Sequence, residues 1–193
     1  PKSLSEKGLA LREMLSLMIA QRRPSHYLTK GRDELASLTD SHLRLPVVDT
    51  DRATLEATDF AAFRPLSSLP LGMTAHVVFS ALDPAQPATT SATIIEQVIR
   101  GTIGFHGLLM SDDVSMNALA GSIAERTRAI VNAGCDMVLH CNGKLDEMRD
   151  VARETPELTG EALKRAGRAL ASRKPPQPLD RQAARAELDA LTD

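Results

Sequence analysis

Short apolar segments alternate with amphipathic stretches through the middle of the chain. The segments 73–79, 107–111 and 135–140 predict buried strands, because each is short, apolar and partly β-branched. Helical spacing of apolar residues follows over 91–100 and 123–133, and further helices are predicted over 144–154 and 160–173. Ser91 is a candidate N-cap, and Gly101 and Gly134 are candidate helix stops. Strands that alternate with helices pair in parallel, so the predicted fold class is α/β.

The two ends of the chain differ from this middle region. Residues 1–39 show helical periodicity but no strand pattern, and the apolar stretch 11–20 contains Arg12 and Glu13. That stretch is too short to span a bilayer and is interpreted as an amphipathic helix. The segment 174–193 opens with Pro175-Pro176 and predicts a linker followed by an exposed helix. The expected divisions are therefore 1–39, 40–173 and 174–193.

Composition narrows the class of protein. The chain has 193 residues, 42% hydrophobic and 25% charged, which is typical of one globular domain. A net charge of -2, four Phe, one Tyr and no Trp argue against a nucleic-acid-binding protein. No signal peptide or membrane span is predicted. Cys135 and Cys141 lie in one predicted strand, roughly 20 Å apart, too far for a disulfide. A reducing, cytoplasmic location is expected.

Candidate chemistry is sought at the carboxyl ends of the strands, where parallel α/β proteins place their sites. Asp112 and Asp113 follow the predicted strand 107–111. A carboxylate held rigidly there suits a nucleophile or the stabiliser of a developing cation. Asp is also a preferred helix cap, so one or both could serve the backbone instead. The adjacent pair allows one residue to reach the site while the other holds the chain.

Other polar residues give weaker signals. Asp40 and His42 could form a carboxylate–imidazole pair for acid/base chemistry, or could be uncoupled surface residues. The remaining histidines and both cysteines match no metal-binding spacing, so no metal site is expected, and His76 and His140 are interpreted as pocket-lining or core residues. A loose glycine series at 101, 104 and 107 precedes a strand, so it does not predict a dinucleotide loop.

Several segments together resemble one known family. They are GMTAHVVFSALDP at 72–84, IRGTIGF at 99–105, GLLMSDDVSM at 107–116, AGCDMVLHCNG at 133–143, and DSHL with LPVVD at 40–49. Their order and spacing are similar to those of bacterial family 3 glycoside hydrolases, within them the β-N-acetylhexosaminidases of cytoplasmic peptidoglycan recycling. The resemblance extends over residues 40–173.

The resemblance implies a fold, an activity and roles for particular residues. The fold would be the C-terminal half of a (β/α)8 TIM-type barrel, with parallel strands and crossover helices. Asp112 would be the nucleophile, His42 the general acid/base and Asp40 the residue that orients His42; His76 and Met116 would bind substrate. The reaction would be retaining hydrolysis of terminal β-linked N-acetylglucosamine, without a metal or cofactor. The substrate would be a muropeptide or its anhydro-disaccharide.

The chain also departs from the family's pattern. The first strands of the barrel are missing, and 27–37 lacks the His and Pro expected before Asp-Ser-His, so no role is assigned to Lys30. Such a half would need self-association or a complementing N-terminal half. The alternative is a truncated, inactive remnant that acts as an interaction module. A barrel enzyme for a phosphorylated substrate would need a glycine-rich cradle, and His140-Cys141-Asn142-Gly143 offers one glycine.

Overall fold

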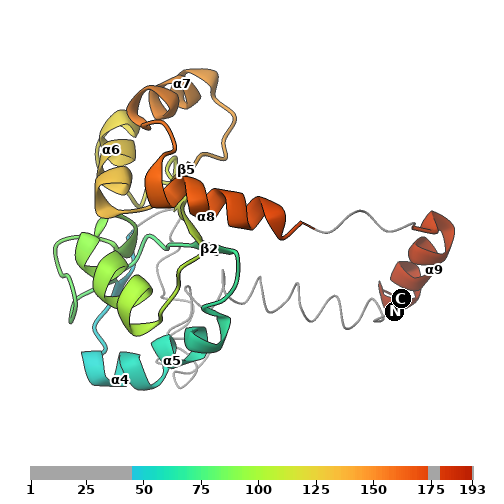
Figure 1. The fold of residues 1–193 in the computed structure, drawn as a ribbon, viewed down its shortest axis with the longest axis horizontal. Helices are drawn as coiled ribbons and strands as arrows, with labels where there is room; N and C mark the ends of the chain where they lie inside the picture. Colours follow the sequence, from blue (N-terminus) through green and yellow to red (C-terminus); the bar gives the residue numbers. More distant parts are fainter. Residues whose placement is uncertain (1–44, 174–178, 193) are drawn as a thin grey trace.

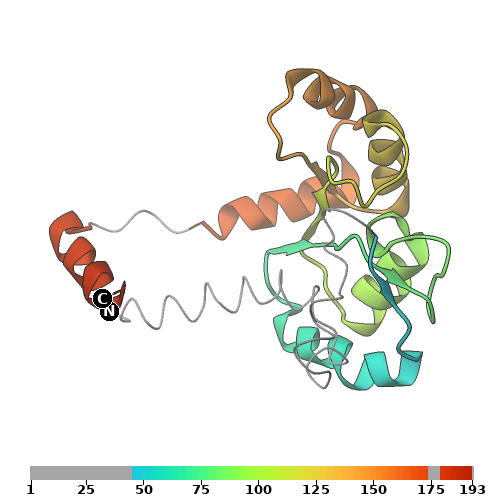
Figure 2. The same cartoon turned by 180° about the vertical axis from the view of Figure 1, so that it is seen from behind.

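The computed structural model describes residues 45–173 and 179–192 of the chain (Figures 1 and 2). It is a mixed α/β structure with short strands and longer helices. The strands are β1 (Val47–Val48), β2 (Leu71–Met73), β3 (Val78–Phe79), β4 (Leu108–Asp113) and β5 (Met137–Leu139). The α-helices are α4 (Arg52–Ala57), α5 (Asp59–Phe63), α6 (Ile123–Ala133), α7 (Leu145–Glu154), α8 (Gly160–Ala171) and α9 (Arg181–Thr192). Two short 3₁₀-helices are η1 (Arg64–Leu66) and η2 (Ala88–Thr90), and η3 (Ile94–Thr102) is a π-helix.

Every strand pair among the described residues is parallel, as the alternating pattern predicts. β1 pairs with β3, and β4 lies between β2 and β5 in a second sheet. Parallel strands need crossover connections, and helices supply them between β4 and β5 and along the preceding segments. The α/β fold class is therefore confirmed for this part of the chain.

The predicted strand 73–79 is interrupted. Its first part pairs with β4, ending where Thr74 N donates to Met110 O, and its last part pairs with β1. Between them, Val77 N donates to Ala75 O in a tight turn. The expectation of one continuous strand is wrong, because residues 74–77 leave one sheet and enter the other. This break places the buried side chain of His76 beside the end of β4.

Two of the three expected helix boundaries agree with the structure, and one differs. Ser91 caps its helix as predicted, since Ser91 Oγ accepts from Ile94 N at 3.1 Å. The helix then continues with π-type spacing through Thr102, so Gly101 lies inside it and is not its stop. In α6, Ser122 and Glu125 form a capping box, and Gly134 ends the helix at a φ of 104°.

The hydrophobic core consists of two clusters on either side of η3. One packs α4, α5 and the β1–β3 pair against η3, and the other packs η3 and α6 against β4. Ile103 contacts both clusters and links them. The largest fully buried side chains are Leu55, Ile95, Leu109 and Ile130.

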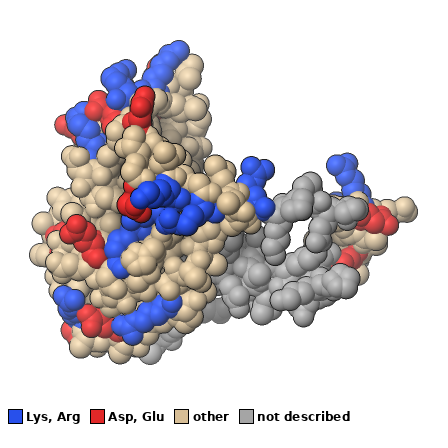
Figure 3. All heavy atoms as spheres, viewed as in Figure 1, with Lys and Arg blue, Asp and Glu red and all other residues tan. Residues whose placement is uncertain are grey.

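The C-terminal helices lie where the sequence places them. α7 and α8 agree with the predictions to within two residues, and α9 confirms a helix in the tail. In Figures 1 and 2, α8 crosses the body and α9 lies apart from it. Basic side chains gather over α8 in Figure 3, with acidic ones beside them. No helix in the described ranges is long and apolar enough to cross a membrane.

Candidate active site

A β-bulge sits at the carboxyl end of β4. Met110 pairs with Met137 and Asp113 with Leu139, so three steps along β4 match two along β5. Ser111 Oγ accepts from Leu139 N at 3.0 Å, and this side-chain bond stands in for the interrupted ladder. A bulge redirects the side chains beside it and increases the local twist. Asp112 lies on the bulged segment, so its carboxylate is aimed by this irregularity.

The Asp112 carboxylate is nearly buried, and few groups among the described residues balance its charge. Its side chain belongs to a residue that is 9% exposed. Its hydrogen bond within the described ranges comes from the Asp113 amide, at 2.9 Å to Oδ1. In those ranges no Lys or Arg forms an ion pair with it. A rigid carboxylate with an unengaged oxygen can attack an electrophile or stabilise a developing cation.

Asp113 has the other role that the sequence left open, since it holds the backbone. Its Oδ1 accepts from Ser115 N at 3.0 Å and from Cys141 N at 3.1 Å, and Oδ2 accepts from Ser115 Oγ at 2.7 Å. The carboxylate therefore joins the turn after β4 to the loop after β5. It forms a turn within the loop instead of capping α6, whose N-cap is Ser122.

His76 is buried directly behind this strand end. It is 1% exposed, and its Nε2 lies 2.9 Å from Asp113 O while its Nδ1 lies 2.9 Å from Thr89 Oγ1. Thr74 Oγ1 donates to Thr89 Oγ1 at 2.9 Å, which extends the chain of hydrogen bonds. Burial lowers the pKa of His76, opposed by the Asp113 carbonyl and the two Asp charges. The pocket-lining or core alternative thus resolves to a buried core histidine.

Arg126 of α6 fixes the loop that follows the candidate nucleophile. Its Nε donates to Gly121 O at 2.9 Å, and its NH1 donates to Val114 O and Met116 O at 3.1 Å each. Because these bonds engage the guanidinium with backbone carbonyls, α6 and the loop 114–121 form one unit. Met116 is only 5% exposed in this arrangement.

A second polar network borders the site after β5. Glu147 Oε2 accepts from Asn142 Nδ2 at 2.7 Å and pairs with His140 Nε2 at 3.0 Å, and Oε1 pairs with Lys144 Nζ at 3.1 Å. Hydrogen bonds from Asn142, His140 and Lys144 lower the pKa of Glu147 to about 2. This carboxylate holds the loop 140–144, and within that loop the Cys141 amide donates to Asp113 Oδ1.

Some predicted site residues lie outside the described residues, namely Asp40 and His42. Asp112 is placed at the carboxyl end of β4 as expected. Contact of His76 and Met116 with a substrate stays a prediction; both side chains are buried here. Across 45–173 and 179–192, no group of three His, Cys, Asp or Glu residues is arranged to hold a metal ion. Both cysteines are free thiols, Cys135 buried and Cys141 exposed.

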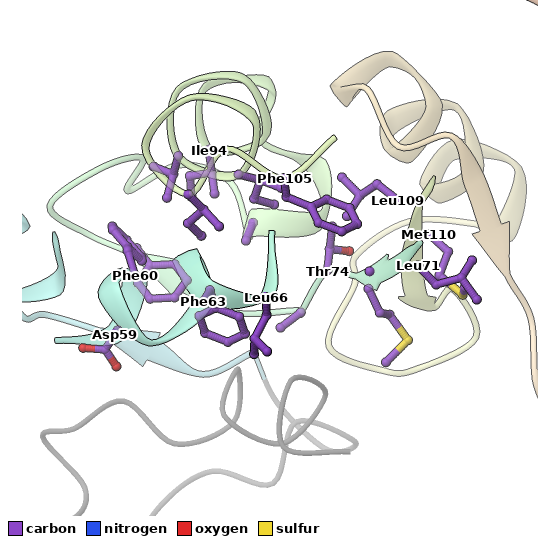
Figure 4. A pocket seen from close by; sticks show the side chains of 18 of the residues that line it. Asp59, Phe60, Phe63, Leu66, Leu71, Thr74, Ile94, Phe105, Leu109 and Met110 are labelled. Atoms are coloured by element: carbon purple, nitrogen blue, oxygen red, sulfur yellow. The ribbon is translucent and has the colours of Figure 1, made fainter. Parts of the chain in front are cut away.

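An apolar cavity of about 310 Å³ has Thr74 among its lining residues, next to the network of Thr89 and His76. Figure 4 shows Phe60, Phe63 and Leu66 on one side of it, with Ile94 and Phe105 on the other. Asp59 is the one titratable residue among its lining residues, and Asp112 and His76 are not among them. The cavity therefore belongs to the apolar packing and not to the carboxylate cluster.

Sequence reasoning missed the residues that support Asp112. Thr89 and Thr74 lie in a loop and in the middle of an expected strand, and neither belongs to a chemical motif. Glu147 was assigned only to a helix, although it stands in the first turn, where a carboxylate is favoured. The pairing of Glu147 with His140 could have been expected, because a histidine interpreted as buried needs a hydrogen-bond partner and Glu147 is a carboxylate seven residues later.

Comparison with known proteins shows a consistent family. The family described as Glycosyl hydrolase family 3 N terminal domain matches residues 26–170. A Beta-hexosaminidase of Neisseria gonorrhoeae is 40% identical over 151 residues, which cover 75% of this chain and 39% of that protein. A Beta-hexosaminidase of Alkalilimnicola ehrlichii is 49% identical over 107 residues, covering 53% of this chain and 30% of that protein.

A solved structure agrees with these sequence matches. Native NagZ from Neisseria gonorrhoeae superposes with a TM-score of 0.59 at 36% identity, covering 77% of this chain and 42% of that one. The chain therefore spans between 30% and 42% of the length of these relatives.

Proposed function

The chain belongs to glycosyl hydrolase family 3, and we propose that it hydrolyses terminal β-linked N-acetylglucosamine with Asp112 as nucleophile. The substrate class is peptidoglycan-derived: a muropeptide, or the disaccharide of N-acetylglucosamine and 1,6-anhydro-N-acetylmuramic acid. The relatives named Beta-hexosaminidase support the activity. A cytoplasmic site of cell-wall recycling is part of the same proposal.

The observation that carries the proposal is the state of Asp112. Its carboxylate stands on the bulge at the carboxyl end of β4 and accepts one hydrogen bond, from the adjacent amide. Asp113 is bound on both of its oxygens, so the two neighbouring carboxylates have different roles. A nucleophile needs a fixed position and a free lone pair, and Asp112 has both.

The proposed reaction proceeds in two steps with retention of configuration. The Asp112 carboxylate attacks the anomeric carbon, the glycosidic bond breaks, and His42 gives its proton to the leaving oxygen. Water then attacks the same carbon, His42 takes the water's proton, and the bond to Asp112 breaks. Asp40 favours the imidazolium form of His42 and fixes its orientation, as a carboxylate partner does.

The fold that accompanies this proposal is the C-terminal half of a (β/α)8 TIM-type barrel. The parallel pairs β1–β3, β2–β4 and β4–β5 support it, since the strands of such a barrel are parallel. The first strands of the barrel would supply groups that bind the sugar hydroxyls. Self-association or a complementing N-terminal half would provide them.

His76 and Met116 complete the proposed set as substrate-binding residues. Both are buried in the structure described here, so each would reach a substrate only through a shift of the loop 114–121 or of residues 74–77. The loop 114–121 is held by Arg126, which opposes such a shift for Met116.

The test is the stereochemistry of hydrolysis by the purified full chain. Proton NMR of an aryl N-acetyl-β-glucosaminide reaction should show the β anomer of N-acetylglucosamine first, followed by slow mutarotation. The matched aryl β-glucoside, which lacks the acetamido group, should react more slowly. Initial release of the α anomer would contradict the double-displacement mechanism, and no release from either glycoside would contradict activity of this chain.

A second candidate function is an inactive remnant that acts as an interaction module. The observation that favours it is the burial of His76 and Met116, the two proposed substrate-binding residues. Titration of the chain with N-acetylglucosamine by calorimetry, beside the turnover assay, separates the two. Binding without turnover would favour the module, whereas turnover with retention would exclude it.

A further inference from the structure

We propose that His76, whose Nε2–H donates to Asp113 O while its Nδ1 accepts from the Thr74–Thr89 hydroxyl chain, is a positioning residue that aims the Asp112 carboxylate through Asp113. The inference rests on the proposed function, in which Asp112 is the nucleophile. It differs from a substrate-binding role, because both ring nitrogens of His76 are already engaged within the protein.

The hydrogen-bond partners determine the tautomer of His76. Asp113 O is a carbonyl and can only accept, so Nε2 must carry the proton and donate. In a neutral ring Nδ1 then accepts, and the Thr89 hydroxyl donates to it. The Thr89 oxygen in turn accepts from the Thr74 hydroxyl. Each hydroxyl therefore has one direction, and the chain leaves no donor of these three side chains unused.

Burial keeps the imidazole neutral. His76 is 1% exposed, and desolvation lowers its pKa, whereas the Asp113 carbonyl and the charges of Asp112 and Asp113 raise it. The positive charge of Arg126, a residue of α6, lowers the pKa of His76 further. An imidazolium here would place a positive charge beside Asp112 and weaken its carboxylate as a nucleophile. A neutral donor positions the strand end without that cost.

Asp113 transmits the position of His76 to the nucleophile. Its carbonyl is held by His76 and by Met116 N at 3.2 Å, and its carboxylate is held by Cys141 N. Its own amide donates to Asp112 Oδ1. Asp113 pairs with Leu139 at the end of the bulge, but its own amide and carbonyl bond to Asp112, His76 and Met116 and not to β5. Loss of the His76 bond would loosen the amide that orients Asp112.

The experiment is NMR of the full chain with ¹⁵N labelling, compared across four variants. H76L removes the donor, and H76Q returns an amide N–H near the Nε2 position. T89V removes the hydroxyl that donates to Nδ1. T90V is the matched control, because the Thr90 hydroxyl is the neighbouring one and bonds to Gln86 and Pro87, away from His76.

The expected result is a neutral Nε2–H imidazole at residue 76 throughout the stable pH range of the native chain. Hydrogen exchange of the Asp113 amide should accelerate about tenfold or more in H76L and recover most of the way in H76Q. T89V should keep the Nε2–H form, because Asp113 O still requires a donor, but should shift the ¹⁵N resonance of Nδ1, which loses its hydrogen bond; T90V should match the native spectra. Titration of His76 near its ordinary pKa, or equal Asp113 exchange in H76L and T90V, would overturn the inference.

An activity measurement separates this inference from the proposed function. If the native chain hydrolyses an aryl N-acetyl-β-glucosaminide, kcat should fall about 100-fold in H76L with KM nearly unchanged, because misplacement of a reacting group costs about that much. H76Q should restore much of kcat. A rise in KM with kcat unchanged would overturn the positioning role. If the native chain has no turnover, the proposed function fails, while the NMR comparison still decides how His76 holds Asp113.

Discussion

A nearly buried carboxylate lies at each end of the β4–β5 pair, and the two carboxylates differ in their hydrogen-bond and ion-pair partners. At the amino end, Asp136 is bound by two guanidinium groups and a backbone amide. At the carboxyl end, Asp112 is bound by one adjacent amide. The comparison shows that charge compensation, more than burial, distinguishes a structural carboxylate from one that is available for chemistry.

At the amino end the network is fully satisfied. Arg100 NH2 and Arg165 NH1 lie 2.9 Å and 2.8 Å from separate oxygens of Asp136, and Leu109 N donates to Oδ2 at 2.8 Å. Arg100 NH1 also donates to the carbonyls of Phe105 and Gly107. This cluster joins η3, β4, β5 and α8, so its removal should affect the whole fold.

At the carboxyl end the bonds hold everything around Asp112 and leave Asp112 itself open. Asp113, Arg126 and Glu147 each engage several backbone or side-chain groups in the neighbouring loops. Preorganised surroundings with one unengaged reactive group are what catalysis by positioning requires. The two ends therefore differ in how far their carboxylates are bonded, and the less bonded one is the proposed nucleophile.

The largest expected contrast between the two ends is in thiol reactivity, because the two cysteines flank β5. Burial raises the pKa of Cys135, before the strand, to about 12; partial burial and the charges of Asp113 and Asp112 also raise the pKa of Cys141, after the strand, but this thiol is exposed. At about pH 8 we expect iodoacetamide to modify Cys141 about a thousandfold faster, because the thiolate is the nucleophile and Cys135 is also closed to the reagent. Intact-protein mass spectrometry should show one adduct, and C141S should show none until the chain unfolds. Rapid double labelling of the folded chain would contradict a closed amino end.

The next effect is on stability. D136N should lower the free energy of unfolding by about 3–5 kcal/mol, because it leaves Arg100 and Arg165 without their buried partner charge. Urea denaturation followed by circular dichroism measures the change. D150N is the control, because Asp150 forms an exposed pair with Arg153 and is 41% exposed. If D136N and D150N have the same stability, the amino-end cluster is not structural.

The smallest expected effect is a pH dependence at the carboxyl end. The pKa of Glu147 is lowered from 4.5 to about 2, so its carboxylate stabilises the folded state above pH 4.5. That stabilisation is lost as the pH falls through about 2, where the folded state also binds the proton. E147Q should therefore lower Tm near neutral pH and have little effect near pH 2. E161Q, on a surface pair with Lys164, is the control, and a pH-independent difference for E147Q would contradict this linkage.

Much of this arrangement could be predicted from the sequence, and the failures have physical causes. Helix α6 was predicted because its apolar stripe agrees with its stop residue, and α7 and α8 were predicted with basic residues toward their ends. The strand 73–79 looked continuous because Thr74 and His76 alternate with apolar residues, and only their tertiary hydrogen bonds reveal the break. Tertiary context thus outweighed local pattern.

The candidate site follows the same division. Asp112 was identified from its place after an apolar run, and the structure places it at the carboxyl end of β4. The bulge that orients it depends on pairing with β5, and β5 begins at Met137, 24 residues after Asp113 in the sequence. Asp136 gave a signal that was not used, a carboxylate beside an apolar strand, which must find a partner when buried.

The most direct test of the account measures turnover and thermal unfolding of D112N beside the native chain and D136N. D112N should lose turnover of an aryl N-acetyl-β-glucosaminide by at least about a thousandfold, because the nucleophile is removed. Its Tm should stay close to that of the native chain, since among the described residues Asp112 accepts only the adjacent amide bond, whereas D136N should lose Tm. Retained turnover in D112N, equal background rates in D112N and the native chain, or a loss of Tm in D112N as large as that in D136N, would contradict the account.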